Sequence, residues 1–296
     1  MQGKMQAVAV MTCAAGLSLV LPLIGLVSNA VLALYSLRKG LREGLWLLGM
    51  GGVTMAVIDA LTTGTGYLAL GFSLLVWLPL LLVSIALRET GSLAVTLELA
   101  FGLGSLVVLA IYAINSDPSA YCSENLHRVT RPLLTNAPPE LDANTVSANI
   151  NVIAHYMSGM VIGGAVLTMV LSLFLGRWWQ DLLFNPGGFS SEFNRMKMHS
   201  WLAYVCLALV GVALFTDASV GVRELTSNMS IPLLILFLIN GLAVIHALLA
   251  KKESWRFLVT GLYILLFIVP HMILPVTLVG LSDVWLDWRK KGGLTA

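Results

Sequence analysis

Long apolar stretches separated by short polar breaks dominate the pattern of residues along this chain. A helix needs about 20 apolar residues to cross the roughly 30 Å hydrocarbon core of a membrane. About eight stretches are long and apolar enough to form such helices. They are residues 5–37, 44–62, 66–87, 92–114, 149–175, 199–215, 230–250 and 254–285. The pattern therefore predicts an all-α, polytopic transmembrane bundle, with a single integral membrane domain over residues 1–296.

The first and last stretches are too long for one helix each. Each would extend about 45–50 Å as a straight helix, which overshoots even a tilted crossing. Pro22 interrupts the first stretch, and Pro270 and Pro275 interrupt the last. We therefore expect each stretch to form a hairpin of two short helices, spanning or re-entrant, which gives about ten helices in all. One long, tilted and kinked helix at each end is the alternative.

The composition excludes a water-soluble domain and the basic residues predict an orientation. Apolar residues make up 58% of the chain and charged residues 11%, whereas a soluble domain carries about a quarter charged residues. Lys and Arg collect on the cytoplasmic side of membrane proteins. With both ends folded as hairpins and both termini cytoplasmic, only Arg128, Arg131 and Arg223 of the 17 Lys and Arg residues lie outside. This asymmetry also favours the hairpin at the C-terminal end.

Residues 115–148 form the longer polar interruption, which this orientation makes an extracytoplasmic loop. Its four prolines predict an irregular start. They are Pro118, Pro132, Pro138 and Pro139. Residues 141–152 are expected to begin a helix that continues into the fifth apolar stretch.

Residues 176–198 form the second interruption, which we interpret as a cytoplasmic elbow at the membrane interface. Indole rings prefer the headgroup layer, and the Asn-Pro-Gly-Gly run at 185–188 predicts a turn. A short helix with a greasy side is expected to follow it. A surface that docks another protein is the alternative to a simple elbow. The docking candidates are Trp178, Trp179, Pro186, Gly187, Phe189 and Phe193.

Three stretches of the chain resemble a known family. They are GRWWQ…NPGGF…EF within residues 176–193, NGLAVIH at 240–246 and GLSDVWLDWRK at 280–290. Each is similar to a motif of the YybS-like family of uncharacterised bacterial multi-pass membrane proteins, which implies a place in the bacterial inner membrane. That family is distantly similar to the membrane-embedded substrate-binding components of energy-coupling-factor vitamin transporters. This resemblance implies binding of a small solute.

Few ionisable side chains fall inside the apolar stretches, where they are costly and usually face an interior or a cavity. Glu98 and His246 lie at comparable depths toward the cytoplasmic side, with Asn240 near the middle of its stretch. We expect Glu98 and His246 to form an ion pair, because opposite charges within a few ångströms favour the charged forms of both. These three residues are the inner candidates for solute binding.

On the outer side, Asn151, His155 and Ser158 share one helical face at positions i, i+4 and i+7. Asp59 and His271 are expected at a similar depth. The outer binding candidates are therefore Asp59, Asn151, His155 and His271. Hydrogen bonding among packed helices is the alternative to a polar pocket, at about 0.6–2 kcal/mol per bond.

The function predicted from these features is binding or transport of a small solute. A non-transporting membrane scaffold that uses the elbow to dock a cytoplasmic or membrane protein is the alternative. The sequence contains no phosphate-binding loop, no metal-ligand spacing and no nucleophile motif. We therefore expect no enzyme activity, no cofactor, no metal and no nucleic-acid partner; the expected partners are the lipid bilayer, a solute and a protein.

Overall fold

The computed structural model describes residues 3–115, 117–135, 143–184, 186–215, 219–250 and 254–291. Within these ranges the chain forms only helices, with no strand. The elements are α1 (Lys4–Leu17), η1 (Pro22–Ile24), α2 (Gly25–Lys39), α3 (Leu41–Thr63), α4 (Tyr67–Thr90), α5 (Leu93–Ile114), α6 (Pro118–Thr135), α7 (Ala143–Phe184), α8 (Gly188–Arg195), α9 (Ser200–Phe215), α10 (Val220–Leu249), α11 (Trp255–Ile268), η2 (Pro270–Met272), α12 (Ile273–Leu286) and α13 (Trp288–Lys291). The all-α class predicted from the apolar pattern is confirmed.

Several of these helices suit a membrane. In the described part of the chain, α3, α4, α5, α7 and α10 are each long and apolar enough to cross one. Two further pairs, α8 with α9 and α11 with α12, qualify when each pair counts as one span, although they bend by 57° and 118°. The terminal helices α1, α2, α11 and α12 have 14 or 15 residues each. Each is about 21–23 Å long, which is short of a full crossing of roughly 30 Å.

Both terminal apolar stretches fold back at a proline, as predicted. Pro22 opens η1, and the hydroxyl of Ser28 on α2 donates a 2.8 Å hydrogen bond to the backbone oxygen of Met11 on α1. Pro270 opens η2 between α11 and α12. Pro275 does not divide the last stretch, contrary to the prediction. It lies in the first turn of α12, where a helix loses no internal hydrogen bond to proline.

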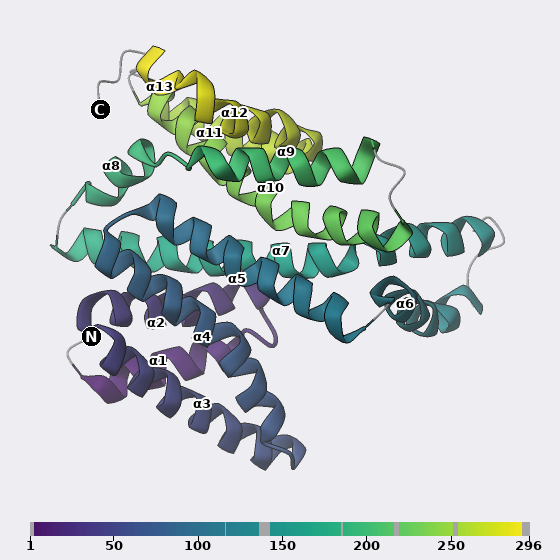
Figure 1. Ribbon diagram of the computed structural model, residues 1–296. Helices are drawn as coiled ribbons and strands as arrows, with labels where there is room; N and C mark the ends of the chain where they lie inside the picture. Colours follow the sequence, from purple (N-terminus) through teal and green to yellow (C-terminus); the bar gives the residue numbers. More distant parts are fainter. Residues whose placement is uncertain are drawn as a thin grey trace.

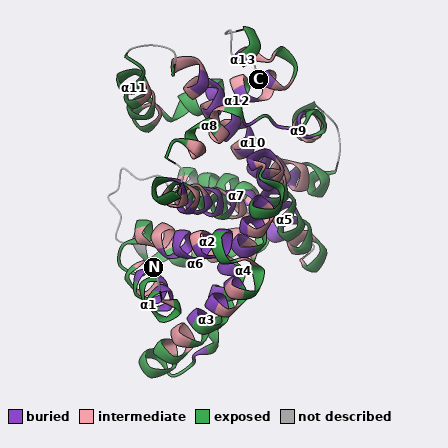
Figure 2. Cartoon of the chain, turned by 90° about the vertical axis from the view of Figure 1, so that its left-hand side faces the viewer, coloured by how far each residue is buried: buried purple, intermediate pink, exposed green. Residues whose placement is uncertain are grey.

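Helix α7 lies at the centre of the fold. Figure 1 shows α1 to α4 on one side of it and α9, α11 and α12 on the other, and the turned view in Figure 2 agrees. Helices α2, α5, α6 and α10 all pack against α7. The contact with α2 is close because of Gly176, where a Cβ would lie 2.9 Å from the backbone oxygen of Ala30. A larger residue at position 176 would force α2 away from α7.

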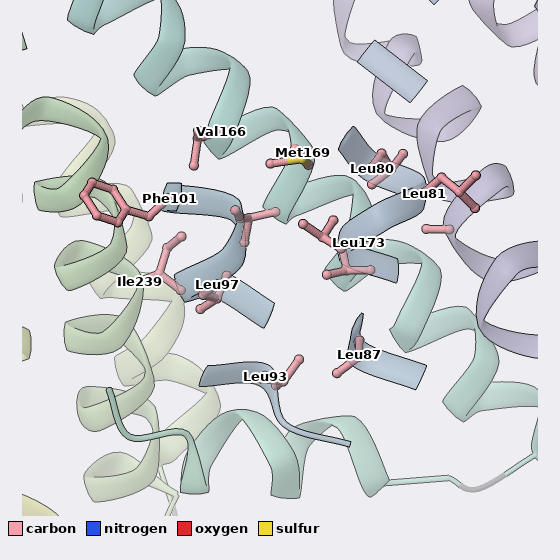
Figure 3. Packing of buried hydrophobic residues seen from close by; sticks show 14 of the residues in the cluster. Leu80, Leu81, Leu87, Leu93, Leu97, Phe101, Val166, Met169, Leu173 and Ile239 are labelled. Carbon is pink, nitrogen blue, oxygen red and sulfur yellow. The ribbon is translucent and has the colours of Figure 1, made fainter. Parts of the chain in front are cut away.

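The apolar core lies where α4, α5, α7 and α10 meet. Figure 3 shows Leu97 of α5 between Ile239 of α10 and the α7 residues Met169 and Leu173, with the ring of Phe101 directed toward α10. All five side chains are buried. Burial of an apolar side chain of this size stabilises a fold by about 1.5–3 kcal/mol in water. Inside a bilayer close packing supplies more of the stability, because lipid tails are as apolar as leucine.

Most helix ends that carry Lys and Arg meet at one end of the bundle, which is the left-hand end in Figure 1. We call it the basic end. There Lys4 pairs with Glu43 at 2.7 Å, and the guanidinium of Arg88 donates a 2.8 Å hydrogen bond to the backbone oxygen of Leu37. The turns that follow α1, α3 and α11 lie at the opposite end (Figure 1). The start of α1 and the end of α12 therefore share the basic end.

The stretch expected to start irregularly is instead helical. Pro118 occupies the first position of α6, where its missing N–H costs no hydrogen bond. The carboxylate of Asp117 accepts a 2.9 Å hydrogen bond from the backbone N–H of Ala120 and caps the helix. Pro132 lies inside α6, and Pro138 and Pro139 fall outside the described residues.

Helix α7 begins at Ala143 and so continues into the fifth apolar stretch, which confirms that prediction. It ends later than expected. The helix runs through Trp178 and Trp179 to Phe184, so the first part of the predicted elbow is a straight extension of the span. The turn follows it, with Gly187 at φ +96°, and α8 then folds back toward the bundle.

Candidate functional site

A cavity of about 570 Å³ opens among α1, α2, α3 and α4. Small-molecule sites measure about 300–1,000 Å³ and are mainly apolar with a few polar groups. The apolar lining residues here are Ala15, Leu19, Pro22, Met55, Ile58, Leu68, Ala69, Phe72, Val76 and Trp77. Thr168 of the central helix α7 also contributes to the lining. The cavity therefore has the size and character of a ligand site, and it touches the core of the bundle.

The mouth of the cavity faces the end opposite to the basic end. Leu19, from the turn after α1, and Thr62 and Thr63, from the last turn of α3, line it and are exposed. Pro22 holds the turn after α1 in place, because its ring fixes the backbone at the start of η1. The cavity thus opens between the N-terminal hairpin and the α3–α4 turn.

Asp59 stands at this mouth, on α3. Its carboxylate accepts hydrogen bonds from the hydroxyl of Thr63 at 2.8 Å and from the backbone N–H of Ala69 at 3.2 Å. Ala69 belongs to the first turn of α4, so Asp59 caps that helix from a neighbouring one. Gly64 and Gly66, at φ +80° and +75°, make the tight turn that brings the two helices together. The carboxylate oxygens keep further lone pairs for a ligand.

Asn29 and Trp77 supply a polar group deep in the cavity. The indole N–H of Trp77 on α4 donates a 3.1 Å hydrogen bond to the amide oxygen of Asn29 on α2, and both residues are buried. Among the described residues, the amide nitrogen of Asn29 has no acceptor. Buried polar groups nearly always find a partner. The Asn29 amide nitrogen is therefore a donor available to a bound molecule.

Four hydroxyl groups of the lining can act as acceptors toward the cavity. They belong to Ser18, Ser28, Thr62 and Ser73. Each hydroxyl donates its hydrogen to a backbone oxygen at 2.6–2.9 Å. Its oxygen lone pairs are then the part left for a ligand.

The electrostatics of the cavity favour one kind of ligand. No Lys, Arg or His is among the lining residues, and Asp59 is the ionisable one. A negatively charged group would lose its hydration there and meet a carboxylate. A mostly apolar molecule with a hydrogen-bond donor or a cationic group fits these groups better. In the described ranges no three His, Cys, Asp or Glu residues come together in a way that could hold a metal ion.

Apart from Asp59, the outer candidates do not line this cavity. Asn151 on α7 accepts a 2.7 Å hydrogen bond from Ser123 on α6. His155, one turn along α7, lies 3.7 Å from Glu224 on α10. His271 is exposed in η2, which packs against α11 and α12 on the far side of the bundle. The sequence predicted a similar membrane depth for these residues. Depth alone does not indicate which helices are neighbours.

The predicted pair of Glu98 with His246 is wrong. Glu98 lies 2.6 Å from the Nδ1 atom of His199 at the start of α9. His246 instead contacts the hydroxyl of Tyr263 at 3.2 Å, and its ring packs edge-on against Phe193 of α8. Helix α8 and the start of α9 separate the two residues, because the chain folds back between α7 and α10. The apolar pattern alone does not indicate that separation.

Asn240 lies in a buried ion-pair cluster at the basic end. Its amide nitrogen donates a 2.8 Å hydrogen bond to the backbone oxygen of Gly280. Its amide oxygen lies 3.4 Å from the guanidinium of Arg289, which pairs with Asp283 at 2.9 Å. Asp283 and Arg289 are both buried. The ion pair of Asp283 with Arg289 therefore reaches inward to Asn240.

The docking candidates divide into two groups. Phe189 and Phe193 turn inward, where their rings pack against Phe174 at centroid distances of 5.5 and 5.6 Å. Trp179 is half-buried against the core. Trp178 is 46% exposed, and Pro186 and Gly187 of the turn are also exposed. The elbow therefore folds onto the bundle with its aromatic side.

Sequence reasoning missed the residues deep in the cavity. Asn29 lies in the first apolar stretch and carries no charge, so it was not among the ionisable side chains that marked candidate sites. Trp77 reads as a core aromatic in sequence, and only its contact with Asn29 gives it a polar role. A single asparagine in an apolar helix is the signal that could have found this pair, since an amide in a membrane needs partners.

Comparison with known proteins places the chain in a family. Residues 7–284 match the model of the family described as "Predicted membrane protein (DUF2232)". The match covers most of the chain, which therefore belongs to this family of membrane proteins. No curated protein and no solved structure matches it.

Proposed function

We propose that this member of the family binds a small, mainly apolar solute in the cavity among α1 to α4. The observation that carries the proposal is the cavity itself, about 570 Å³ in volume and open at one end of the bundle. Asp59 at the mouth and the free amide nitrogen of Asn29 at depth are the groups that would orient the solute. The distant resemblance to substrate-binding components of energy-coupling-factor transporters supports the same class of function.

The orientation proposed here puts the basic end in the cytoplasm. The positive-inside rule supports it, because the helix ends that gather at that end carry most of the Lys and Arg residues. In a bacterial inner membrane the cavity would then open to the outside, and both termini would be cytoplasmic. The solute would arrive from the extracytoplasmic side.

The chemistry of the lining defines the solute further. We infer an apolar body with a primary amine or another donor group, because the lining oxygens accept and Asp59 is negative. A carboxylate or phosphate would find no cation among the lining residues. The same composition favours binding over catalysis, since a catalytic site needs a nucleophile or an acid–base pair. Asp59 has no second ionisable group beside it in the lining.

The scaffold alternative has weaker support. Docking by the elbow would use its aromatic side chains, but Phe189 and Phe193 already pack against Phe174. Trp178 remains exposed, and the interface preference of indole accounts for it without a partner.

The test is binding of a matched pair of probes to the purified protein in detergent. Phenethylamine has an apolar ring and a cationic amine, and hydrocinnamate has the same ring with a carboxylate. We expect phenethylamine to raise the midpoint of thermal unfolding in a concentration-dependent way, and hydrocinnamate to have little effect. Equal stabilisation by both probes would contradict the proposed ligand class.

Two substitutions on α4 separate the cavity from the lipid-facing surface. Ser73 lines the cavity and is buried, whereas Leu75 is 67% exposed. Ser73→Phe should fill the cavity and abolish the stabilisation by phenethylamine, and Leu75→Phe should leave it intact. Asp59→Asn should weaken binding of the amine several-fold. Unchanged binding by the Ser73→Phe protein would overturn the proposal that this cavity is the site.

A further inference from the structure

A second group of polar residues, unrelated to the cavity, is buried where α5, α7 and α10 meet. Its centre is Glu224, which is 5% exposed and lies in the second turn of α10. Asn228 follows it by one turn and is 0% exposed. Carboxylates in such positions are expensive and usually serve a function. The apolar stretch at 230–250 did not include Glu224, so the sequence pattern missed it.

The two oxygens of the Glu224 carboxylate have different surroundings. Oε1 accepts a 2.7 Å hydrogen bond from the hydroxyl of Tyr112 on α5. Oε2 lies 3.7 Å from Nδ1 of His155 on α7. That distance permits charge attraction but is too long for a hydrogen bond. In the described part of the chain Oε2 accepts no hydrogen bond, which leaves it able to take a proton.

Asn228 connects this carboxylate to the backbone of α7. Its amide nitrogen lies 2.9 Å from the Tyr112 hydroxyl and 2.7 Å from the backbone oxygen of His155, and its amide oxygen accepts from the backbone N–H of Gly159. In an undisturbed α-helix the backbone oxygen of His155 would accept a hydrogen bond from the backbone N–H of Gly159, because the two residues are four apart. The Asn228 amide therefore bonds both members of one backbone pair of α7.

Glycine makes this contact possible. A Cβ at Gly159 would lie 2.6 Å from the backbone oxygen of Asn228. The backbone oxygen of Asn228 lacks the usual helical N–H donor four residues later, because that position is Pro232. Helices α7 and α10 thus contact each other through their backbones at the level of Asn228. A displacement of one helix at this level therefore displaces the other.

The surroundings of Glu224 contain few other charges. Cys122 on α6 is close enough to sense the charge of Glu224. Burial, and then the negative charge of Glu224, raise the pKa of the Cys122 thiol. Helix α9 also packs against α10, and its residues 207–215 are all apolar or glycine. Helix α12 meets α10 further along, near Gly241. Tyr112, Cys122 and His155 are therefore the described titratable groups that face the carboxylate from neighbouring helices.

We propose that Glu224 is a proton-binding site, that His155 exchanges its proton with solvent, and that Tyr112 and Asn228 transmit its protonation state to α7. The His155 side chain is 30% exposed and that of Glu224 is 6% exposed, so solvent reaches the imidazole first. The imidazolium gives its proton to Oε2 and becomes neutral, and the carboxylate becomes a carboxylic acid. Protonation removes the negative charge of the carboxylate, which weakens the hydrogen bond that Oε1 accepts from the Tyr112 hydroxyl and lets this hydroxyl change its partner.

Infrared difference spectroscopy and amide hydrogen exchange test the two halves of this proposal. The full-length protein in detergent is compared from about pH 4 to about pH 9, which brackets carboxyl and imidazole titration. Acidification should produce a protonated-carboxyl band that Glu224→Gln removes. Exchange at residues 155–163 should change several-fold with pH in the wild type and become independent of pH in Glu224→Gln. Absence of a Glu224-dependent band would overturn the proposal.

Glu98→Gln is the matched control, because Glu98 also pairs with a histidine, at the basic end. It should leave the pH response of residues 155–163 unchanged. Tyr112→Phe keeps the carboxyl group, so it should retain and shift the Glu224 band while losing the exchange response. It also serves if Glu224→Gln fails to fold. An unshifted band, or an exchange response that persists in Tyr112→Phe, would contradict the transmission through Tyr112.

Discussion

The cavity region of α1 to α4 and the contact between α7 and α10 handle polar groups in opposite ways. In the cavity region the helices leave an open space between them, and Asn29, Trp77 and Asp59 border it. Between α7 and α10 the helices touch through glycine, and the polar side chains of Glu224 and Asn228 bond directly to the neighbouring helix. A loose contact leaves room for a solute. A tight contact transmits a local change, because packed interfaces shift between discrete arrangements.

The difference originates in side-chain size along the helices. Gly159 and Gly163 face α10, where a Cβ would lie 2.6 Å from the Asn228 backbone oxygen and 2.9 Å from a side-chain carbon of Ile235. Small residues spaced by four let two backbones approach. In the cavity region the large side chains of Phe72 and Trp77 on α4 line the space between the helices. Substitutions that reverse these sizes should convert one type of contact into the other.

The largest effect is expected from Gly159→Val. The added side chain cannot fit beside Asn228, so α7 and α10 must separate, and we expect a loss of about 3 kcal/mol, at the upper end for overpacking. Gly164→Val is the control on the same helix, because a Cβ at Gly164 meets no atom within 4 Å. Its effect should stay within about 0.5 kcal/mol. Unfolding in increasing SDS measures both, and equal losses would show that the contact is not tight.

Asn228→Leu should have the next largest effect. Leucine has the same branched side-chain skeleton, but it leaves the His155 oxygen and the Gly159 N–H without their side-chain partner. We expect a loss of about 2 kcal/mol, because unmade hydrogen bonds of buried groups cost about 1–3 kcal/mol. The same SDS titration measures it. A stable variant would mean that α7 closes its own hydrogen bond at no cost, and that Asn228 does not shape the helix.

Much of the fold was predictable because helices that cross a membrane are long apolar stretches, which a single sequence shows directly. The apolar stretches located the long helices, and the prolines at 22 and 270 located the hairpins. The irregular start expected at Pro118 was an avoidable error. Asp117 followed by Pro118 is a typical helix start, with a capping carboxylate and a proline in the first position. The irregular start was predicted from the number of prolines in this stretch. The position of each proline within a helix decides its effect, and the number does not.

The candidate site was predictable only in part. Asp59 was found because a carboxylate in an apolar helix is conspicuous, and it lines the cavity. The pairing of Glu98 with His246 failed because depth gives one coordinate of a residue and says nothing of which helices are neighbours. Glu224 escaped notice because α10 begins ten residues before the apolar stretch at 230. A carboxylate four residues before Asn228 on one helical face was the available signal.

In the cavity region, Trp77→Phe should have a smaller effect than either change at α10. Phenylalanine keeps most of the ring but leaves the Asn29 amide oxygen without its donor. We expect a loss of about 1 kcal/mol, the usual net contribution of one hydrogen bond. Trp201→Phe is the control, because Trp201 is 51% exposed. A loss as large as that of Asn228→Leu would show that the cavity wall is as rigid as the α7–α10 contact.

The smallest effect concerns α6, which packs against α7 at the end where Glu224 is buried. The backbone N–H of Ala120 and then the hydroxyl of Ser119 hold the pKa of Asp117 below its ordinary value. A depressed pKa means that the capped helix start is stabilised above the ordinary carboxyl pKa. This stabilisation is lost as the pH falls through the lowered value.

Amide exchange at residues 119–121 should therefore quicken on acidification, while Asp117→Asn, which still caps but does not titrate, should remove that dependence. If α6 also covers the Glu224 network, the response at residues 155–163 should survive in Asp117→Asn, because its titrating group is Glu224. Loss of both responses in this variant would show that the acid response of α7 comes from fraying of α6 and not from Glu224.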